Sequence, residues 1–195
     1  PSPHRRGSAY YSVLRYLLGD HKPYIYKTDD YGKTWSLLTS GTNGIPADEP
    51  VRVVREDPSR AGLLYAGTEF GMYVSFNDGR QWQPLQLNLP NTPITDLKVH
   101  QKDLVISTQG RAFWIMHNIT PLHEVSDAMS RGAAHLYAPR DAYRIRYRAA
   151  FGGLESAREG GTDPEYPAAG AVVDYWFATA PQGEVTLEVL DARGT

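Results

Sequence analysis

The sequence contains no cysteine, which excludes disulfide bonds and thiolate chemistry but does not fix the compartment. It also has no long apolar run: the longest, AGAVVDYWFATA, falls well short of the roughly 20 residues of a membrane-spanning helix. The net charge of −2 gives no electrostatic reason to expect nucleic acid, and no basic groove interleaved with aromatics occurs. We therefore predict no transmembrane segment and no nucleic-acid partner.

Motifs of reactive sites are missing as well. The stretches GTEFG and GTNG lack the spacing of a phosphate-binding or dinucleotide loop, and the GxSxG nucleophile motif is absent. The histidines are scattered, without a carboxylate at metal-ligand spacing. His117, beside Trp114, is more typical of a packed or capped residue than of a metal ligand. The sequence thus predicts no cofactor, no metal and no catalytic residue.

What the sequence does contain favours an all-β fold. It has 13 tyrosines, 4 tryptophans and many short Val/Ile/Thr runs, which Gly, Pro and Asn interrupt. No helix of normal length is predicted, and residues 123–135 could form a turn or two at most. Because the sequence starts without methionine and stops just after a strand, we expect the interior of a longer polypeptide, whose targeting cannot be read.

One short pattern occurs twice. KTDDYGKTW and VSFNDGRQW share a hydroxyl residue, an Asp or Asn, a glycine and a tryptophan, and the second copy starts 47 positions after the first. This period is close to that of one four-stranded propeller blade, about 40–50 residues. The aligned residues are Thr28, Asp30, Gly32 and Trp35 in the first copy and Ser75, Asn77, Gly79 and Trp82 in the second.

Strand signals fill the interval between the repeats. One whole blade is predicted from four short strands at 51–57, 63–69, 71–76 and 81–87. Another blade begins with strands at 94–100, 103–110 and 111–118. Residues 8–16 are predicted to be the second strand of the blade that contains the first repeat, and the first strand of that blade would lie upstream. Residues 1–122 are therefore predicted to form about two and a half blades of a partial β-propeller.

The acidic residues of the repeated pattern could belong either to a reactive centre or to a structural turn. On the hairpin between the third and fourth strands, the side-chain oxygen of Asp30 or Asn77 can accept backbone N–H bonds. Gly32 and Gly79 supply the positive φ that such a turn needs, and the two tryptophans are expected to bury their rings against a neighbouring layer. An asparagine cannot act as an acid or base, so Asn77 favours the structural interpretation.

The pattern [S/T]-x-[D/N]-x-G-x-x-W is the Asp-box, or BNR repeat, of sialidases, sortilin-type receptor domains and many exported bacterial propellers. Within this group the chain resembles the C-terminal part of bacterial sortilin-like "glycosyl hydrolase, BNR repeat" proteins. KPYIYKTDDYGKTW, VRVVREDPSRAGLLYAGTEFGMYVSFNDGRQWQPLQLNLP, DLVISTQGRAFWIMHNITPL and LYAPRDAYRIR carry the resemblance. It implies a periplasmic or extracellular protein. Sialidase-like catalysis would imply an arginine triad and a Tyr/Glu pair spread around the ring, which cannot be placed on any position here because most of the expected blades are absent.

After Pro121 the period breaks. We expect residues 123–170 to be a connecting segment, with a strand at 135–150 followed by a Gly/Pro-rich linker. Arg144, Arg146 and Arg148 would form one face of that strand, either a docking stripe for an acidic partner or anionic lipid headgroups, or a solvated face. Two strands, at 171–180 and 183–194, are predicted within residues 171–195, where the resemblance implies the start of a truncated Ig-like domain.

The resemblance to propeller enzymes and receptors also implies a binding face, on the loops between the second and third strands of each blade. The side chains expected to converge there are those of Asp20, His21, Glu69, Phe70, Gln109 and Arg111. Glu69 and Arg111 could equally form an ion pair between neighbouring blades.

Two functions fit these sequence features. The first is a non-catalytic protein-interaction or scaffold module of an exported propeller, in one form an accessory subunit of a larger, membrane-associated assembly. The second is a glycoside hydrolase with paired carboxylates across the propeller face, for which a glycan is the partner and Glu69 the only nearby acid.

Overall fold

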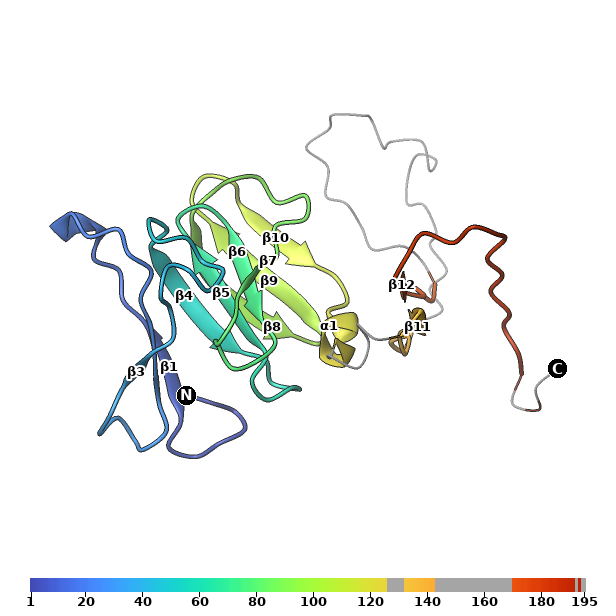
Figure 1. Cartoon of the computed structure of the whole chain (residues 1–195), viewed down its shortest axis with the longest axis horizontal. Coiled ribbons are helices and arrows are strands. Elements are labelled where there is room, and N and C mark those ends of the chain that lie inside the picture. Colours follow the sequence, from blue (N-terminus) through green and yellow to red (C-terminus); the bar gives the residue numbers. More distant parts are fainter. Residues whose placement is uncertain (126–131, 143–169, 192, 194–195) are drawn as a thin grey trace, which may run out of the picture. The chain divides into compact units, whose positions relative to one another are not determined.

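The computed structural model describes residues 1–125, 132–142, 170–191 and 193. Contacts divide the chain into two compact units, residues 1–125 and 126–195, each of which is described by itself. Antiparallel strands make up nearly all of the regular structure (Figure 1). The predicted all-β class is therefore confirmed, although the described strands do not close into a barrel or a ring.

The first unit contains three antiparallel sheets, in which strands that are consecutive in sequence lie side by side. The first sheet consists of β1 (Ala9–Ser12), β2 (Ile25–Thr28) and β3 (Ser36–Leu37). The second has four strands, β4 (Val51–Glu56), β5 (Leu64–Thr68), β6 (Met72–Ser75) and β7 (Gln83–Pro84). The third consists of β8 (Ile94–His100), β9 (Asp103–Thr108) and β10 (Phe113–Met116).

Two short helical segments accompany the strands. The 3₁₀ turn η1 (Tyr16–Leu18) lies between β1 and β2, and helix α1 (Thr120–Glu124) follows β10. Helix α1 begins three residues before the turn predicted at 123–135. No helix among the described residues is long and apolar enough to cross a bilayer.

The second sheet is a middle layer with a core on each face, so β5 and β6 are buried along their whole length. Nearly continuous apolar runs are typical of strands that are covered on both sides, and in β5 and β6 only the last residues, Thr68 and Ser75, are polar. The cluster toward the first sheet contains Ile25, Ile45, Val51, Val54, Leu64, Ala66, Tyr73 and Trp82. The cluster toward the third contains Val53, Leu63, Tyr65, Met72, Val74, Leu89, Ile94, Leu97, Leu104, Ile106 and Ile119.

One glycine sets the spacing between the second and third sheets. A Cβ atom on Gly67 would lie 2.6 Å from Ile94 Cγ2 and 2.8 Å from Val53 Cγ1, closer than carbon atoms pack. The absence of a side chain in the middle of β5 therefore lets β8 approach the second sheet.

The second unit differs from its prediction. Its strand β11 (Ala134–Leu136) pairs antiparallel with β12 (Tyr175–Phe177). The predicted hairpin partner of β12, a strand at 183–194, is wrong for the described part of that range, because residues 183–191 form no strand. Val185, Leu187 and Val189 do alternate, but no described strand offers them a hydrogen-bonding ladder, and their side chains are exposed.

Several tail predictions fall outside the described residues. These are the basic face of Arg144, Arg146 and Arg148, and nearly all of the Gly/Pro-rich linker at 151–170.

Candidate functional site

The first repeated motif lies in the hairpin between β2 and β3. The Thr28 hydroxyl accepts the backbone N–H of Gly32 at 2.9 Å and donates to Asp30 Oδ1 at 2.8 Å. Asp30 Oδ1 also accepts the backbone N–H of Thr34 at 2.9 Å, and Oδ2 accepts the Thr34 hydroxyl at 2.7 Å. Gly32 has φ 85°. Both carboxylate oxygens of Asp30 therefore accept hydrogen bonds within the turn.

The second motif repeats this arrangement between β6 and β7. The Ser75 hydroxyl accepts the Gly79 N–H at 2.9 Å and donates to Asn77 Oδ1 at 3.1 Å. Asn77 Oδ1 accepts the N–H of Gln81 at 2.9 Å, and Gly79 has φ 80°. An amide oxygen therefore makes the same backbone contacts as the carboxylate of the first hairpin, and the turn needs no acid.

Hydrogen bonds also decide the charge of Asp30. The backbone N–H of Thr34, then its hydroxyl and that of Thr28, lower the pKa of Asp30 to about 2. These donors stabilise the ionised carboxylate. A group of this pKa is not suited to carry a proton near neutral pH, where general acid catalysis requires one.

The neighbouring aspartates connect the two hairpins, a feature that the motif alone does not reveal. Lys27 Nζ lies 2.7 Å from Asp78 Oδ2 and 3.0 Å from Asp29 Oδ2. Tyr10 donates to Asp78 Oδ1 at 2.6 Å, and Ser8 donates to Asp29 Oδ1 at 2.7 Å. The Ser8 hydroxyl and Lys27 lower the pKa of Asp29. Asp78 therefore holds the second sheet to Tyr10 and Lys27 of the first, whereas Asp29 binds the same lysine from within the first sheet.

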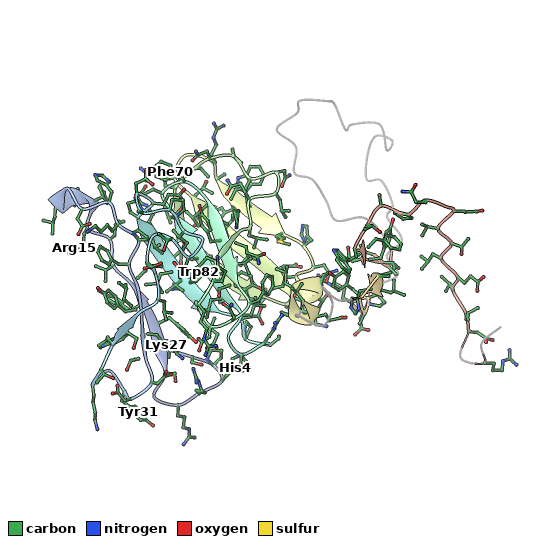
Figure 2. The ribbon with its side chains drawn as sticks, in the orientation of Figure 1. His4, Arg15, Lys27, Tyr31, Phe70 and Trp82 are labelled. Atoms are coloured by element: carbon green, nitrogen blue, oxygen red, sulfur yellow. The ribbon has the colours of Figure 1, made fainter. Side chains whose placement is uncertain are left out.

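The motif tryptophans differ in their surroundings. Trp82, which is labelled in Figure 2, lies in the cluster between the first and second sheets. It is 1% exposed, whereas Trp35 is 46% exposed. The rings of Trp35 and Tyr11 pack edge to face with their centroids 6.2 Å apart, and the indole N–H of Trp35 donates to Gly32 O at 3.1 Å. The prediction of a buried Trp35 is wrong, because no described sheet packs over that side of the first sheet.

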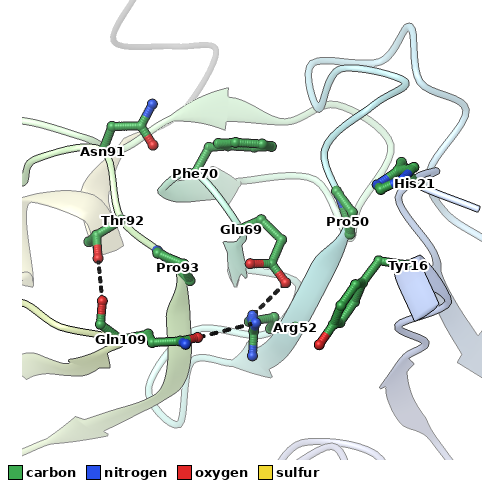
Figure 3. Close-up of a pocket in the computed structure, with 10 residues that line it drawn as sticks. All are labelled: Tyr16, His21, Pro50, Arg52, Glu69, Phe70, Asn91, Thr92, Pro93 and Gln109. Atoms are coloured by element: carbon green, nitrogen blue, oxygen red, sulfur yellow. Dashed lines mark hydrogen bonds and ion pairs between the residues drawn. The ribbon is translucent and has the colours of Figure 1, made fainter. Parts of the chain in front are cut away.

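The hairpins and the predicted binding face lie at opposite ends of the strands: in Figure 2, Tyr31 marks the first hairpin and Phe70 marks the face. A cavity of about 560 Å³ opens at the Phe70 end (Figure 3). It lies where the β1–β2, β5–β6 and β9–β10 loops meet the start of β4 and the segment before β8. Its lining residues are Tyr16, His21, Pro50, Arg52, Glu69, Phe70, Asn91, Thr92, Pro93 and Gln109.

Four of the six predicted side chains line this cavity: His21, Glu69, Phe70 and Gln109. The other two do not. Asp20 turns back to its own loop, where it accepts the Tyr24 hydroxyl at 2.9 Å, and this bond lowers its pKa. Arg111 is exposed, and its backbone N–H donates to Thr108 Oγ1 at 3.0 Å.

Arg52, which sequence reasoning missed, organises the cavity floor. Its Nε donates to Glu69 Oε1 at 2.7 Å, and an Nη atom lies 3.5 Å from Gln109 Oε1 (Figure 3). Its backbone oxygen accepts the Ser12 hydroxyl at 3.0 Å. Arg52 therefore contacts all three sheets, and the alternative ion pair of Glu69 with Arg111 is wrong. The sequence offered one signal for this role, a basic residue inside the otherwise apolar strand VRVV.

No cluster of metal-binding side chains occurs among the described residues. His117, which we interpreted as packed or capped, has its Nδ1 atom 3.5 Å from Asp103 Oδ2 and an exposed ring.

Comparisons with known proteins give little. No family model matches the chain, and no curated protein matches it. Among solved structures, a GH74 enzyme from Niastella koreensis superposes on 60% of this chain with 18% identity and a TM-score of 0.46. The chain spans only 20% of that enzyme's length. A likeness at this level carries no argument about family or activity.

Proposed function

We propose that residues 1–125 are consecutive blades of an Asp-box β-propeller and that the chain is a non-catalytic recognition module. Three antiparallel meanders stacked face to face support the architecture. The equivalent hydrogen bonds of two hairpins, 47 positions apart, support it further. Export to the periplasm or cell surface, and membership of a larger assembly, are proposed from the resemblance of the repeat.

The state of Glu69 is the observation that carries the functional proposal. Among the residues that the structure describes, Glu69 is the only acid that lines the large cavity, and its side chain, 18% exposed, is held by Arg52 at 2.7 Å. A glycoside hydrolase needs two carboxylic groups roughly 5–10 Å apart, one of which carries a proton. A carboxylate that already neutralises an arginine is suited to fixing the shape of a site rather than to proton transfer.

The side chains around that ion pair fit a protein partner. Phe70 is 47% exposed, and Tyr16 stands on the other side of the cavity (Figure 3). Exposed aromatic rings beside an arginine are typical of the residues that anchor protein–protein interfaces. We therefore propose that a partner protein covers this face, with Phe70 as an anchor.

The test compares two exposed phenylalanines in the native protein. In a quantitative pull-down, the wild type should retain a partner protein that Phe70→Ser loses. Phe113→Ser, on β10 and 75% exposed, should keep it. Equal enrichment by all three proteins would contradict the proposal. So would glycan hydrolysis by the native protein that is lost in Glu69→Gln.

A further inference from the structure

A second, smaller cavity adjoins the one described above. It has a volume of about 250 Å³ and shares Phe70 and Asn91 with the larger cavity, so Phe70 stands between the two. Its lining residues are Glu49, Phe70, Gly71, Met72, Tyr73, Pro84, Gln86, Leu89 and Asn91. Ligand pockets usually measure about 300–1,000 Å³, so this volume suits one side chain rather than a whole molecule.

The chemistry of this second cavity differs from that of the first. Glu49 is the only charged residue of the described chain that lines it. Its Oε2 accepts the hydroxyl of Tyr73 at 2.9 Å, and it lies 3.3 Å from the hydroxyl of Thr68, whose one proton is shared with Gly71 O at 3.1 Å; both hydroxyls are neutral. No cation pairs with Glu49 among the described residues, whereas Arg52 neutralises Glu69 in the larger cavity.

The hydroxyl of Tyr73 remains a donor over a wide pH range. Burial and the bond to Glu49 both raise its pKa well above the ordinary value of 10.0. Glu49 is therefore held in place by neutral donors, and no cation of the described residues compensates its negative charge.

We propose that the second cavity binds a lysine or arginine side chain of the partner protein, with the cationic head on Glu49 and the stem against Phe70. The inference rests on the proposed function, because the same partner covers both cavities. An aromatic face attracts a cation, and long basic side chains pack their methylene stems on apolar surface. Met72 and Leu89 supply that surface in the cavity wall.

The first experiment uses a defined probe and the full chain. Calorimetric titration with the peptide Ac-Gly-Lys-Gly-NH₂ should show binding that weakens as salt rises. The same peptide with an acetylated lysine, which carries no charge, should bind about tenfold more weakly. Equal binding of the two peptides, or no binding of the charged one, would overturn the inference without recourse to any variant.

Two neighbouring acids provide matched variants. Glu49→Gln keeps an oxygen that can accept the Tyr73 and Thr68 hydroxyls but removes the charge, so binding of the lysine peptide should fall about tenfold. Asp48→Asn removes an exposed charge next in sequence that does not line the cavity, and binding should stay within about twofold. An equal loss in both variants would indicate a diffuse field rather than a site and would overturn the inference.

The pull-down separates this inference from the proposed function. Partner loss in both Phe70→Ser and Glu49→Gln supports both. Loss of the partner in Phe70→Ser alone supports the proposed recognition face but overturns the inference that a basic side chain binds Glu49. Retention of the partner by both variants overturns the two together.

Discussion

Replacing Trp82 with alanine should destabilise the first unit far more than the same change at Trp35, although the two residues occupy equivalent positions of the repeat. Trp82 is 1% exposed between two sheets, while Trp35 is 46% exposed. A buried tryptophan removes roughly 200 Å² from water, which at about 25 cal/mol per Å² is worth up to about 5 kcal/mol.

One feature lowers that figure for Trp82. Its indole N–H is buried, and no atom of the described residues accepts a hydrogen bond from it. Leaving such a donor unpaired costs about 1–3 kcal/mol, a cost that the alanine variant no longer carries. Subtracting that cost leaves about 2–4 kcal/mol for Trp82→Ala, and the cavity left between the two sheets brings the expected loss to about 3–5 kcal/mol, the range of Trp→Ala changes in cores. Trp35→Ala loses about half of that buried area, worth up to about 2.5 kcal/mol, and leaves no enclosed cavity, so it should cost about 1–2.5 kcal/mol.

Urea denaturation followed by circular dichroism measures both values, provided that the denaturant slope stays the same in the variants. Trp82→Phe is a useful third protein, because it keeps most of the apolar area and removes the unpaired donor; its cost should be about 1 kcal/mol. Equal losses for the two alanine variants would refute the argument that burial between sheets, and not the turn itself, determines the contribution of the tryptophan.

Three further predictions concern single residues. The folded-state pKa of Asp30 is about 2, below its ordinary 3.8, so ionised Asp30 stabilises the fold above about pH 4 and this contribution is lost as the pH falls through 2. In acid titrations, the stability of Asp30→Asn should therefore depend less on pH than that of the wild type. Gly67→Ala, whose Cβ would meet Ile94 at 2.6 Å, should cost about 1–3 kcal/mol in thermal unfolding, and no loss would mean that the sheets can separate freely. Arg52→Met leaves Glu69 without its cation and should cost about 1–3 kcal/mol by urea denaturation, whereas an unchanged midpoint would show that the pair contributes nothing.

The parts of the fold that local chemistry dictates were predictable. The hydroxyl, the Asp or Asn and the glycine of each motif make contacts within a few residues, so the hydrogen bonds of Asp30 and Asn77 follow from the sequence pattern. The alternation and turn signals between 51 and 118 likewise place the strands of the second and third sheets, because each strand pairs with its neighbour in sequence.

What depended on distant partners was not predictable. The repeat treats Trp35 and Trp82 alike, but burial requires a neighbouring sheet, which only Trp82 has among the described residues. Arg52 lies 57 residues from Gln109, so nothing in the local pattern reveals their meeting. Glu69 lines the cavity, yet its expected partner was wrong, because an ion pair follows three-dimensional position rather than loop membership.

The most direct test of the central claim is site-specific photo-crosslinking in the native protein, with benzoylphenylalanine in place of Phe70 or of Phe113. If the face around the larger cavity is a recognition surface, illumination should yield one defined adduct with a partner protein from position 70 and none from position 113. Adducts from position 113 alone, or none from either position while the native protein cleaves a glycan in a Glu69-dependent way, would contradict the account.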